Sequence, residues 1–429
     1  MPTLEESMTS ALKRRAQKSS LRNLSLPSTI QTSSGRIPID FSSNDFLSLS
    51  TSPLLHNEYL SLLHTHLSPP SSQDGSPTSS SNSNPPTLGS TGSRLLTGNS
   101  PLALDLESQI SQFHRSPYLG QGALLFNSGF DANSAFFACV PQKEDVVVYD
   151  EQIHASVHEV VEVVEENFGL GGVTEGGRGY VVVDEAHSTG VYGPEGRGLV
   201  CEVELEGKIF ARLHTFGKAL AGNGAIILTT PLVRHYLLNY ARPLIYSTSL
   251  STPSLHLIAA SYSLLLSSAT VPLQSHLQSL SLHFKSLLSL MPSSSYLKPQ
   301  PQHLSPETEN LNWTPIFSLE TPEPRQLATY CQKAGYNVRP IMSPTVKKGS
   351  ERVRVCLHSG NTIEELEGLV KCVRAWIELM EKRVQVSSGM EIGLQGHRSP
   401  VSGEAIGEGY GSGVGLSFKG RTATEKAKL

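Results

Sequence analysis

The chain has 429 residues, of which 38% are hydrophobic and 17% charged, and its formal net charge is −4. This length exceeds that of one ordinary domain, so we expect two domains with additional segments. The slightly negative charge argues against a general nucleic-acid-binding surface, and no run of 18 apolar residues is present to span a membrane.

The five cysteines are scattered along the chain and show no CxxC spacing. We therefore expect neither a disulfide framework nor a metal site, and we expect a reducing compartment. The N-terminal sequence "MPTLEESMTS" lacks the apolar core of a secretory signal.

The N-terminal part of the chain mixes helical patterns with loop-forming composition. Residues 1–40 are predicted as a helical arm, and "FSSNDFLSL" at 41–49 as a strand end followed by a turn. The Ser-, Pro- and Asn-rich residues 68–87 cannot bury a core, so we predict a disordered insert. Apolar spacing predicts a helix over 104–114, and residues 122–140 are predicted as strand, glycine turn and helix.

Three near-continuous apolar runs, at 145–150, 179–187 and 224–230, predict buried strands. Because they alternate with helical patterns, we predict an α/β fold whose central sheet is mostly parallel and covered on both faces. Residues 41–250 would form this large domain.

The pattern changes after residue 250. Helical spacing at 254–268 and 277–291 is followed by the alternating strand "RVRVCLH" at 352–358 and a long amphipathic helix at 362–384. We predict a smaller α+β domain over 251–384. The Gly- and Ser-rich residues 385–429 are predicted as a flexible tail.

The stretch "VVVDEAHSTGVYGPEGRGL" at 181–199 places Asp184 and His187 directly after a predicted strand. Ligands of open α/β sheets bind at the carboxyl ends of strands. An Asp at that place can pair with the protonated ring nitrogen of pyridoxal phosphate. Capping of the following turn is the alternative interpretation of Asp184.

A lysine in "TFGKAL" at 215–220 is a second candidate. Lys218 lies in a short glycine-flanked turn between apolar runs, where it could form a Schiff base, and the hydroxyl of Thr215 could donate to a phosphate. An ordinary surface lysine is the alternative.

Two further pieces support a cofactor site. "FNSGFDAN" at 126–133 is a strand, Ser-Gly and helix start, an arrangement that can direct amide groups and a helix dipole at a phosphate. His154 follows the predicted strand at 145–150 and could stack on a flat ring; a structural histidine is the alternative.

Taken in order, eight motifs resemble those of the α-oxoamine synthases, a branch of the fold-type I pyridoxal phosphate enzymes. The resemblance runs from about Leu12 to about Lys382. The motifs are "FSSNDFLSL", "GSTGSRLLTGNS", "FNSGFDAN", "IHAS", "DEAHSTGVYGPEGRG", "TFGKAL", "IYSTSL" and "SPTVKKGSERVRV". The resemblance implies a fold-type I transferase that binds pyridoxal 5′-phosphate.

The resemblance also implies catalytic roles, carried by Lys218, His154, Asp184 and His187. Lys218 would bind the cofactor covalently and later move the substrate α-proton. Asp184 would pair with the pyridine nitrogen, His187 would bond to the ring phenolic oxygen, and His154 would stack on the ring face.

The remaining implied residues bind phosphate or substrate. Thr248 would reach the phosphate of a neighbouring subunit, which implies a homodimer. Asn44 would line the substrate pocket, and Arg354 would bind the amino-acid carboxylate as a bidentate fork. The implied phosphate-binding residues within the subunit are Ser128, Gly129, Phe130 and Thr215.

The family condenses an amino acid with an acyl-CoA and releases carbon dioxide. "TFGKAL" and "IYSTS" resemble most the branch that joins alanine to pimeloyl-CoA for biotin synthesis. The branches that form 5-aminolevulinate, 2-amino-3-oxobutyrate or sphinganine remain open, as do an ordinary aminotransferase of this fold and a non-catalytic or truncated paralogue or partner subunit.

One span departs from the family pattern. Only 27 residues, Val157 to Val183, separate Ser156 from Asp184. The family's span is longer, so we expect that about one βα unit of the large domain is missing, which puts activity in doubt.

The chain ends in Ala427, Lys428 and Leu429, a close variant of the Ser-Lys-Leu peroxisomal address. We therefore expect an import receptor as a partner and a peroxisomal location, with the cytoplasm as the alternative.

Overall fold

The computed structural model describes residues 2–17, 32–68, 87–143, 145–149, 179–292, 294–298, 313–343 and 345–395, with the backbone alone from 384, and a few isolated positions that include His154 and Ser156. The chain divides into two compact units, Met1–Met380 and Glu381–Leu429. The predicted insert at 68–87 falls almost wholly outside the described residues, as does the tail beyond 395.

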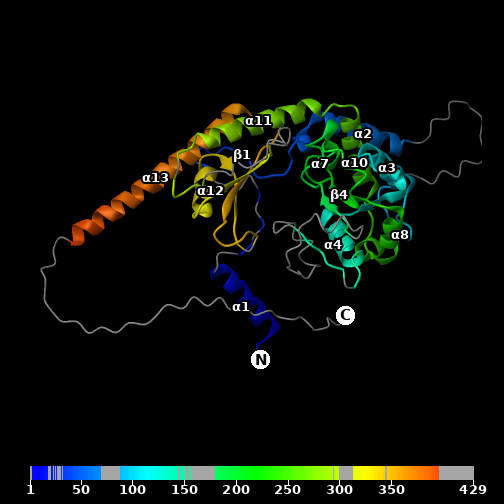
Figure 1. The fold of residues 1–429 in the computed structure, drawn as a ribbon, viewed down its shortest axis with the longest axis horizontal. Coiled ribbons are helices and arrows are strands. Elements are labelled where there is room, and N and C mark those ends of the chain that lie inside the picture. Colours follow the sequence, from blue (N-terminus) through cyan, green and yellow to red (C-terminus); the bar gives the residue numbers. More distant parts are fainter. Residues whose placement is uncertain are drawn as a thin grey trace, which may run out of the picture. The chain divides into compact units, whose positions relative to one another are not determined.

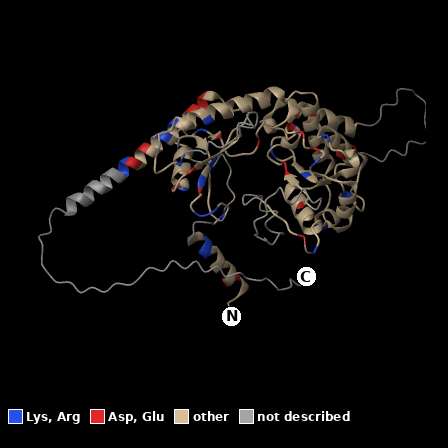
Figure 2. Cartoon of the chain, viewed as in Figure 1, with Lys and Arg blue, Asp and Glu red and all other residues tan. Residues whose placement is uncertain are grey.

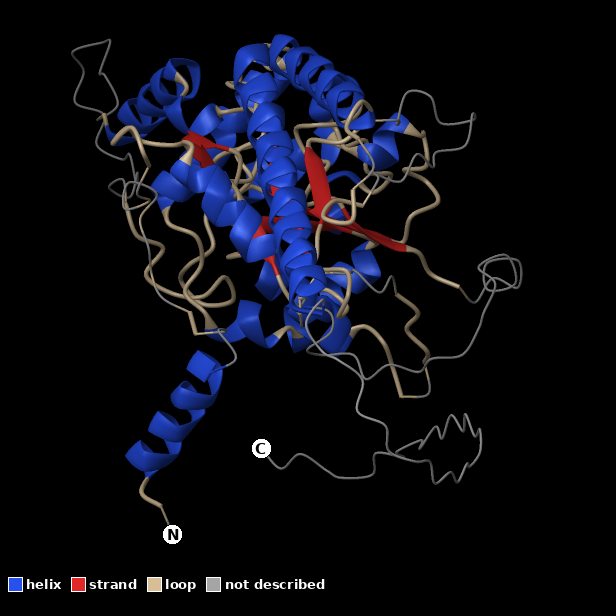
Figure 3. Ribbon diagram, turned by 90° about the vertical axis from the view of Figure 1, so that its left-hand side faces the viewer, coloured by secondary structure: helices blue, strands red, loops and turns tan. Residues whose placement is uncertain are grey.

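The main sheet, which contains the strand β4 labelled in Figure 1, has the strand order β2-β5-β4-β3. Its strands are β2 (Ala123–Phe126), β3 (Val182–Asp184), β4 (Ala211–Thr215) and β5 (Ala225–Leu228). β3 runs parallel to β4, whereas β5 is antiparallel to both of its neighbours, so the sheet is mixed. Figure 3 shows the strands inside a cover of helices.

Helices cover both faces of this sheet because β2 and β5 are apolar on both sides. One buried cluster joins β2 and β5 to α3 (Pro101–Phe113) and α10 (Thr252–Leu266). A second cluster packs the opposite face against α4 (Gly129–Cys139) and α8 (Pro231–Tyr240). The α/β fold expected from the sequence is thus confirmed.

A three-stranded antiparallel sheet of order β6-β9-β8 follows in the chain. Its strands are β6 (Ile316–Glu320), β8 (Arg339–Ile341) and β9 (Arg352–Cys356), and β1 (Ile39–Asp40) pairs with β7 (Tyr336–Asn337) nearby. Every second residue of β9 is buried, as its alternating sequence predicts.

The chain contains further helices outside these sheets. They are α1 (Leu4–Gln17), α2 (Pro53–Leu67), α7 (Leu199–Glu202), α9 (Arg242–Tyr246), α11 (Val271–Ser289), α12 (Pro324–Lys333) and α13 (Ile363–Gln395), with the 3-10 turns η2 (Leu49–Thr51), η3 (Leu119–Gly122) and η4 (Pro194–Gly196). Acidic and basic residues are interspersed along the described part of α13 (Figure 2).

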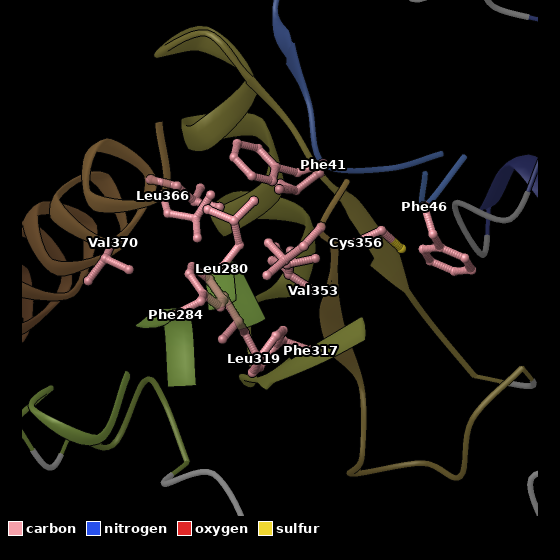
Figure 4. Close-up of a cluster of buried hydrophobic side chains, with 14 of the residues drawn as sticks. Phe41, Phe46, Leu280, Phe284, Phe317, Leu319, Val353, Cys356, Leu366 and Val370 are labelled. Atoms are coloured by element: carbon pink, nitrogen blue, oxygen red, sulfur yellow. The ribbon is translucent and has the colours of Figure 1, made fainter. Parts of the chain in front are cut away.

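The largest buried cluster joins parts that are far apart in the sequence. Phe41 and Phe46 from the loop after β1 belong to one cluster with Phe284 of α11, Phe317 of β6 and Val353 of β9, and Phe46 lies at its edge (Figure 4). This cluster holds the loop after β1 against β9, and both carry candidate site residues.

Two expectations differ from the structure. Residues 145–149 form no strand, and Val146 and Val148 are about half exposed, because no described strand lies beside them to complete backbone pairing. Helix α13 continues to Gln395, beyond the predicted start of the tail at 385.

No single helix among the described residues is long and apolar enough to cross a membrane. Helices α10 and α11 meet that criterion only as a pair, which is bent by 79°.

Candidate active site

Asp184 ends β3, and its carboxylate is fixed from two sides. The side-chain amide of Asn133 donates to Oδ2 at 2.9 Å, and the backbone N–H of Ala186 donates to Oδ1 at 2.9 Å. The Asp184 side chain remains exposed, so both oxygens keep further acceptor capacity. The bond to Ala186 agrees with the turn-capping interpretation, and the second bond shows that the carboxylate is also oriented from α4.

Lys218 lies in the turn between β4 and β5, as predicted from "TFGKAL". Burial lowers the pKa of its amine, Asp184 raises that pKa, and Arg354 lowers it again. The amine, the carboxylate and the guanidinium therefore belong to one electrostatic site. A lysine with a lowered pKa has more of the neutral amine that can act as a nucleophile.

His187 belongs to the same group. The residue is exposed, yet desolvation by the surrounding protein lowers the pKa of His187 to about 4, and the charge of Lys218 is the next largest cause. Arg354 and His154 also lower the pKa, whereas Asp184 raises it. The ring is thus neutral at pH 7 and can donate or accept a hydrogen bond.

His154 stands at the edge of this group. Its Nδ1 accepts from the backbone N–H and the hydroxyl of Ser156, which leaves Nε2 as the protonated nitrogen. Its ring meets that of Phe130 edge to face at 6.5 Å. His154 is exposed, so a face of its ring is available for stacking.

A phosphate-sized group can bind where α4 begins. The Ser128 hydroxyl caps this helix by accepting from the N–H of Asp131 at 3.0 Å. A Cβ at Gly129 would lie 2.6 Å from the Thr215 methyl, so only glycine allows α4 and β4 to approach this closely. The Thr215 hydroxyl oxygen is buried and has no partner in the described structure.

These features suit an anion. The first N–H groups of a helix have no intrahelical partner, and the helix dipole favours negative charge at this end. The Thr215 hydroxyl adds a donor that nothing else uses. The Ser-Gly pattern of "FNSGFDAN" therefore lies beside Thr215.

Arg354, on strand β9, is the candidate site residue that comes from the three-stranded sheet β6-β9-β8. Its Nη2 donates to the carbonyl of Ser42 at 2.9 Å, and its Nε is buried without a partner in the described structure. Asn44 lies two residues beyond Ser42, and its side-chain oxygen is likewise buried and unpartnered.

Thr248 is exposed, and its carbonyl accepts from the side-chain amide of Asn127 at 2.7 Å. The structure therefore connects it to the residue before Ser128 and does not bring it to Lys218. An exposed hydroxyl here is free to meet another molecule.

Sequence reasoning missed several residues around this site. Asn133 is the last letter of "FNSGFDAN", but its bond to Asp184 joins residues that are 51 positions apart. Glu185 is buried and accepts from the N–H groups of Leu199 and Val200, which holds the loop after β3. Arg339 was also missed, because its pairing with Arg354 depends on the register of β8 against β9.

Known proteins resemble this chain over most of its length. A model of the aminotransferase class I and II family matches residues 172–373. The 8-amino-7-oxononanoate synthase of Emericella nidulans is 40% identical, and the match covers 89% of this chain and 97% of that protein. The aminoacyl transferase sphA of Aspergillus fumigatus is 30% identical, with 83% of each chain covered.

Solved structures show the same fold. The serine palmitoyltransferase of Sphingomonas wittichii has a TM-score of 0.66 at 18% identity, over 87% of this chain and 98% of that one. The 8-amino-7-oxononanoate synthase of Francisella tularensis has a TM-score of 0.61 at 20% identity, over 80% and 99%. The fold-type I architecture expected from the sequence is confirmed.

Proposed function

Because the chain belongs to the α-oxoamine synthases, pyridoxal-phosphate-dependent enzymes of the class I and II aminotransferase family, we propose that it condenses L-alanine with pimeloyl-CoA. The products would be carbon dioxide, free coenzyme A and 8-amino-7-oxononanoate, for biotin synthesis. The observation that carries this proposal is the buried, unpartnered Thr215 hydroxyl beside the start of α4, together with Lys218 in the turn after β4, where the charges of Asp184 and Arg354 both act on the pKa of its amine.

The residues present fit pyridoxal phosphate. The unpartnered Thr215 hydroxyl and the start of α4 match its phosphate, and the exposed Asp184 carboxylate matches its ring nitrogen. When bound, the cofactor supplies an electron-withdrawing ring. Asp184 would keep a proton on the ring nitrogen, because a fixed carboxylate favours the cationic form.

The protein's own groups would then handle substrate and protons. Arg354 would bind the amino-acid carboxylate, since Nε is unpartnered and Nη2 is held by Ser42. Lys218 would bind the cofactor, and its neutral amine would take the α-proton. Neutral His187 would bond to the ring phenolic oxygen, and His154 would cover the ring face.

An absorbance titration of purified protein loaded with pyridoxal phosphate tests the proposal. Alanine should change the cofactor spectrum at lower concentration than glycine or serine, and alanine with pimeloyl-CoA should release carbon dioxide. A clear preference for serine would move the protein to the sphinganine-forming branch. After borohydride reduction, the cofactor should be attached to the wild type and absent from Lys218→Ala; attachment to that variant would refute the role of Lys218.

A non-catalytic paralogue or partner subunit is the competing candidate. The presence of Lys218, Asp184 and His187 in one site argues against it. Absence of any spectral response to amino acids in a protein that binds the cofactor would favour it.

We also propose that the enzyme is a homodimer in which Thr248 contacts the phosphate of the neighbouring subunit. The exposure of Thr248 beside Asn127 supports this role. Light scattering should give twice the mass of the chain, and a monomer with full cofactor occupancy would contradict the proposal.

We propose that the short span between Ser156 and Asp184 reflects a missing βα unit. The exposed apolar residues Val146 and Val148 support this, because they have no neighbouring strand among the described residues. Sequencing of messenger RNA from the source should reveal a longer form. Transcripts that all encode the short span, together with a fully active protein, would overturn it.

We propose a peroxisomal location from the terminal Ala427, Lys428 and Leu429, which lie outside the described residues. A fluorescent protein fused to the N-terminus should give a punctate signal that deletion of these three residues abolishes. A diffuse signal from the intact fusion would point to the cytoplasm.

A further inference from the structure

Two arginines face each other across β8 and β9. Arg339 is the register partner of Arg354, and in an antiparallel pair such residues lie on the same face of the sheet. Val353 and Val355 point to the other face, into the core. The two arginines therefore project on the side of the sheet where Arg354 acts on Lys218 and His187.

Neither arginine has an acidic partner in the described structure. Arg352, on the same face, lies 3.8 Å from a carboxylate oxygen of Glu320, whereas no described carboxylate oxygen lies within 4.0 Å of Arg339 or Arg354. The nearby Asp40 is bound to the backbone N–H groups of Ser42 and Ser43. Like charges directly opposite each other destabilise a sheet, so this pair needs a separate explanation.

Both guanidinium groups are held by one neutral residue. Arg354 Nη2 donates to the Ser42 carbonyl at 2.9 Å, and Arg339 Nε donates to the Ser42 hydroxyl at 3.0 Å. The contacts of Arg339 with the described protein leave both of its terminal Nη groups available as an end-on fork. Such a fork matches a carboxylate, and arginine provides it with a fixed charge.

We propose that Arg339 is a specificity-determining residue that binds the carboxylate at the far end of the acyl chain. The inference rests on the proposed function, in which Arg354 binds the carboxylate of the amino acid. Each of the two arginines then binds one substrate carboxylate: Arg354 that of the amino acid and Arg339 that of the acyl chain. The enzyme selects acyl thioesters of dicarboxylic acids over neutral acyl thioesters, because a neutral chain end leaves Arg339 unpaired.

The substitution Arg339→Gln tests this with two thioesters of equal length, pimeloyl-CoA and heptanoyl-CoA. For pimeloyl-CoA we expect KM to rise roughly 10- to 100-fold with kcat nearly unchanged, the range for loss of a hydrogen bond to a charged group. The KM for heptanoyl-CoA and for alanine should stay within about twofold. Arg339→Lys should restore part of the lost affinity, because it keeps the charge.

Arg352→Gln is the matched control, since it changes the same residue type on the same face but at a position that Glu320 already pairs. It should leave the KM values of both thioesters unchanged. Equal losses for the two thioesters in Arg339→Gln, or a rise in the KM for alanine, would overturn the proposal.

Calorimetric binding separates this proposal from the proposed function. Wild-type protein should bind pimeloyl-CoA more tightly than heptanoyl-CoA, and Arg339→Gln should abolish the difference. A wild type that condenses neither thioester would refute the proposed function, while the calorimetric difference would still report on Arg339. Equal binding of the two thioesters by wild type would refute the role of Arg339.

Discussion

Replacement of the buried carboxylate of Glu107, on helix α3, should lower the free energy of unfolding strongly. Its side chain is 1% exposed and lies on α3, where it joins three other elements. Arg94 donates to Oε1 at 2.5 Å, Arg234 lies 3.3 Å from Oε2, and the N–H of Leu125 in β2 donates to Oε1 at 2.9 Å.

Replacing Glu107 by Ala would leave the Arg94 guanidinium buried without compensation. The Arg94 side chain is only 8% exposed, so water cannot replace the lost carboxylate. Breaking a buried ion pair by removing one partner costs about 3–5 kcal/mol, a large share of a typical unfolding free energy of roughly 5–15 kcal/mol. Glu107→Gln keeps an acceptor in place and should cost less, about 1–3 kcal/mol.

Urea unfolding followed by fluorescence and circular dichroism would measure these differences. Glu367→Ala is the control, because Glu367 pairs with Lys371 at 3.6 Å on the surface and should matter by less than about 1 kcal/mol. A free energy of unfolding for Glu107→Ala within about 1 kcal/mol of wild type would refute the reasoning. So would an equal loss in the control.

The effect should extend to the loop that carries Arg94. Arg94 lines a pocket together with Asn127 and Ser249, and the Ser249 N–H donates to the carbonyl of Gly92. The loop therefore depends on Glu107 through Arg94. The Glu107→Ala/Arg94→Met double variant should lose less stability than the sum of the single variants, because it removes the uncompensated charge.

Three other predictions concern protonation, packing and cofactor affinity. Burial lowers the pKa of His114 to about 3, so as the pH falls below 6.5 the unfolded chain binds a proton that the folded chain does not. The free energy of unfolding should therefore drop by about 2 kcal/mol between pH 7 and pH 5 from this residue alone. A urea midpoint that is level or higher at pH 5 would contradict this. A Cβ at Gly98 would lie 1.9 Å from the Gly92 carbonyl oxygen, whereas a Cβ at Gly89 would have no atom within 4 Å. Thermal melting should therefore show that Gly98→Ala loses about 1–3 kcal/mol of unfolding free energy and that Gly89→Ala loses almost none. Thr215→Val should weaken binding of pyridoxal phosphate about tenfold in a fluorescence titration while the melting temperature of the free protein is kept, and unchanged affinity would remove Thr215 from the phosphate site.

The local sequence pattern predicted those helices and strands that form because of their own apolar residues. The apolar runs around Leu125 and Ile227 form strands because they are buried on both faces, and the glycine-flanked Lys218 falls just before the second of them. Strand β4, which carries Arg212 and His214, was not predicted from the sequence. The resemblance added what spacing cannot supply, since it assigned Lys218 and Arg354 to one site although 136 positions of sequence separate them.

Other features arise only when distant residues meet. The rings of His114 and His214 stack 3.7 Å apart in the interior, and neither position is unusual in the sequence. The antiparallel direction of β5 likewise depends on how the chain connects the strands, because a run of four apolar residues carries no information about strand direction. The pairing of Arg339 with Arg354 depends on the register of β8 against β9, which the alternation of each strand leaves undetermined.

The position of β3 connects the shortened span to the chemistry. Among the described strands β3 pairs only with β4, so Asp184 and His187 follow a strand that is supported on one side. Val181 and Tyr180 are exposed there, and Val146 and Val148 form no strand, although each of these sequences is apolar enough for a sheet interior. Loss of the proposed βα unit would account for both departures, since a strand forms only beside a partner. The bonds from Asn133 and Ala186 to Asp184 are therefore the described contacts that fix this carboxylate, and the orientation of the proposed cofactor ring depends on them more than on the sheet itself.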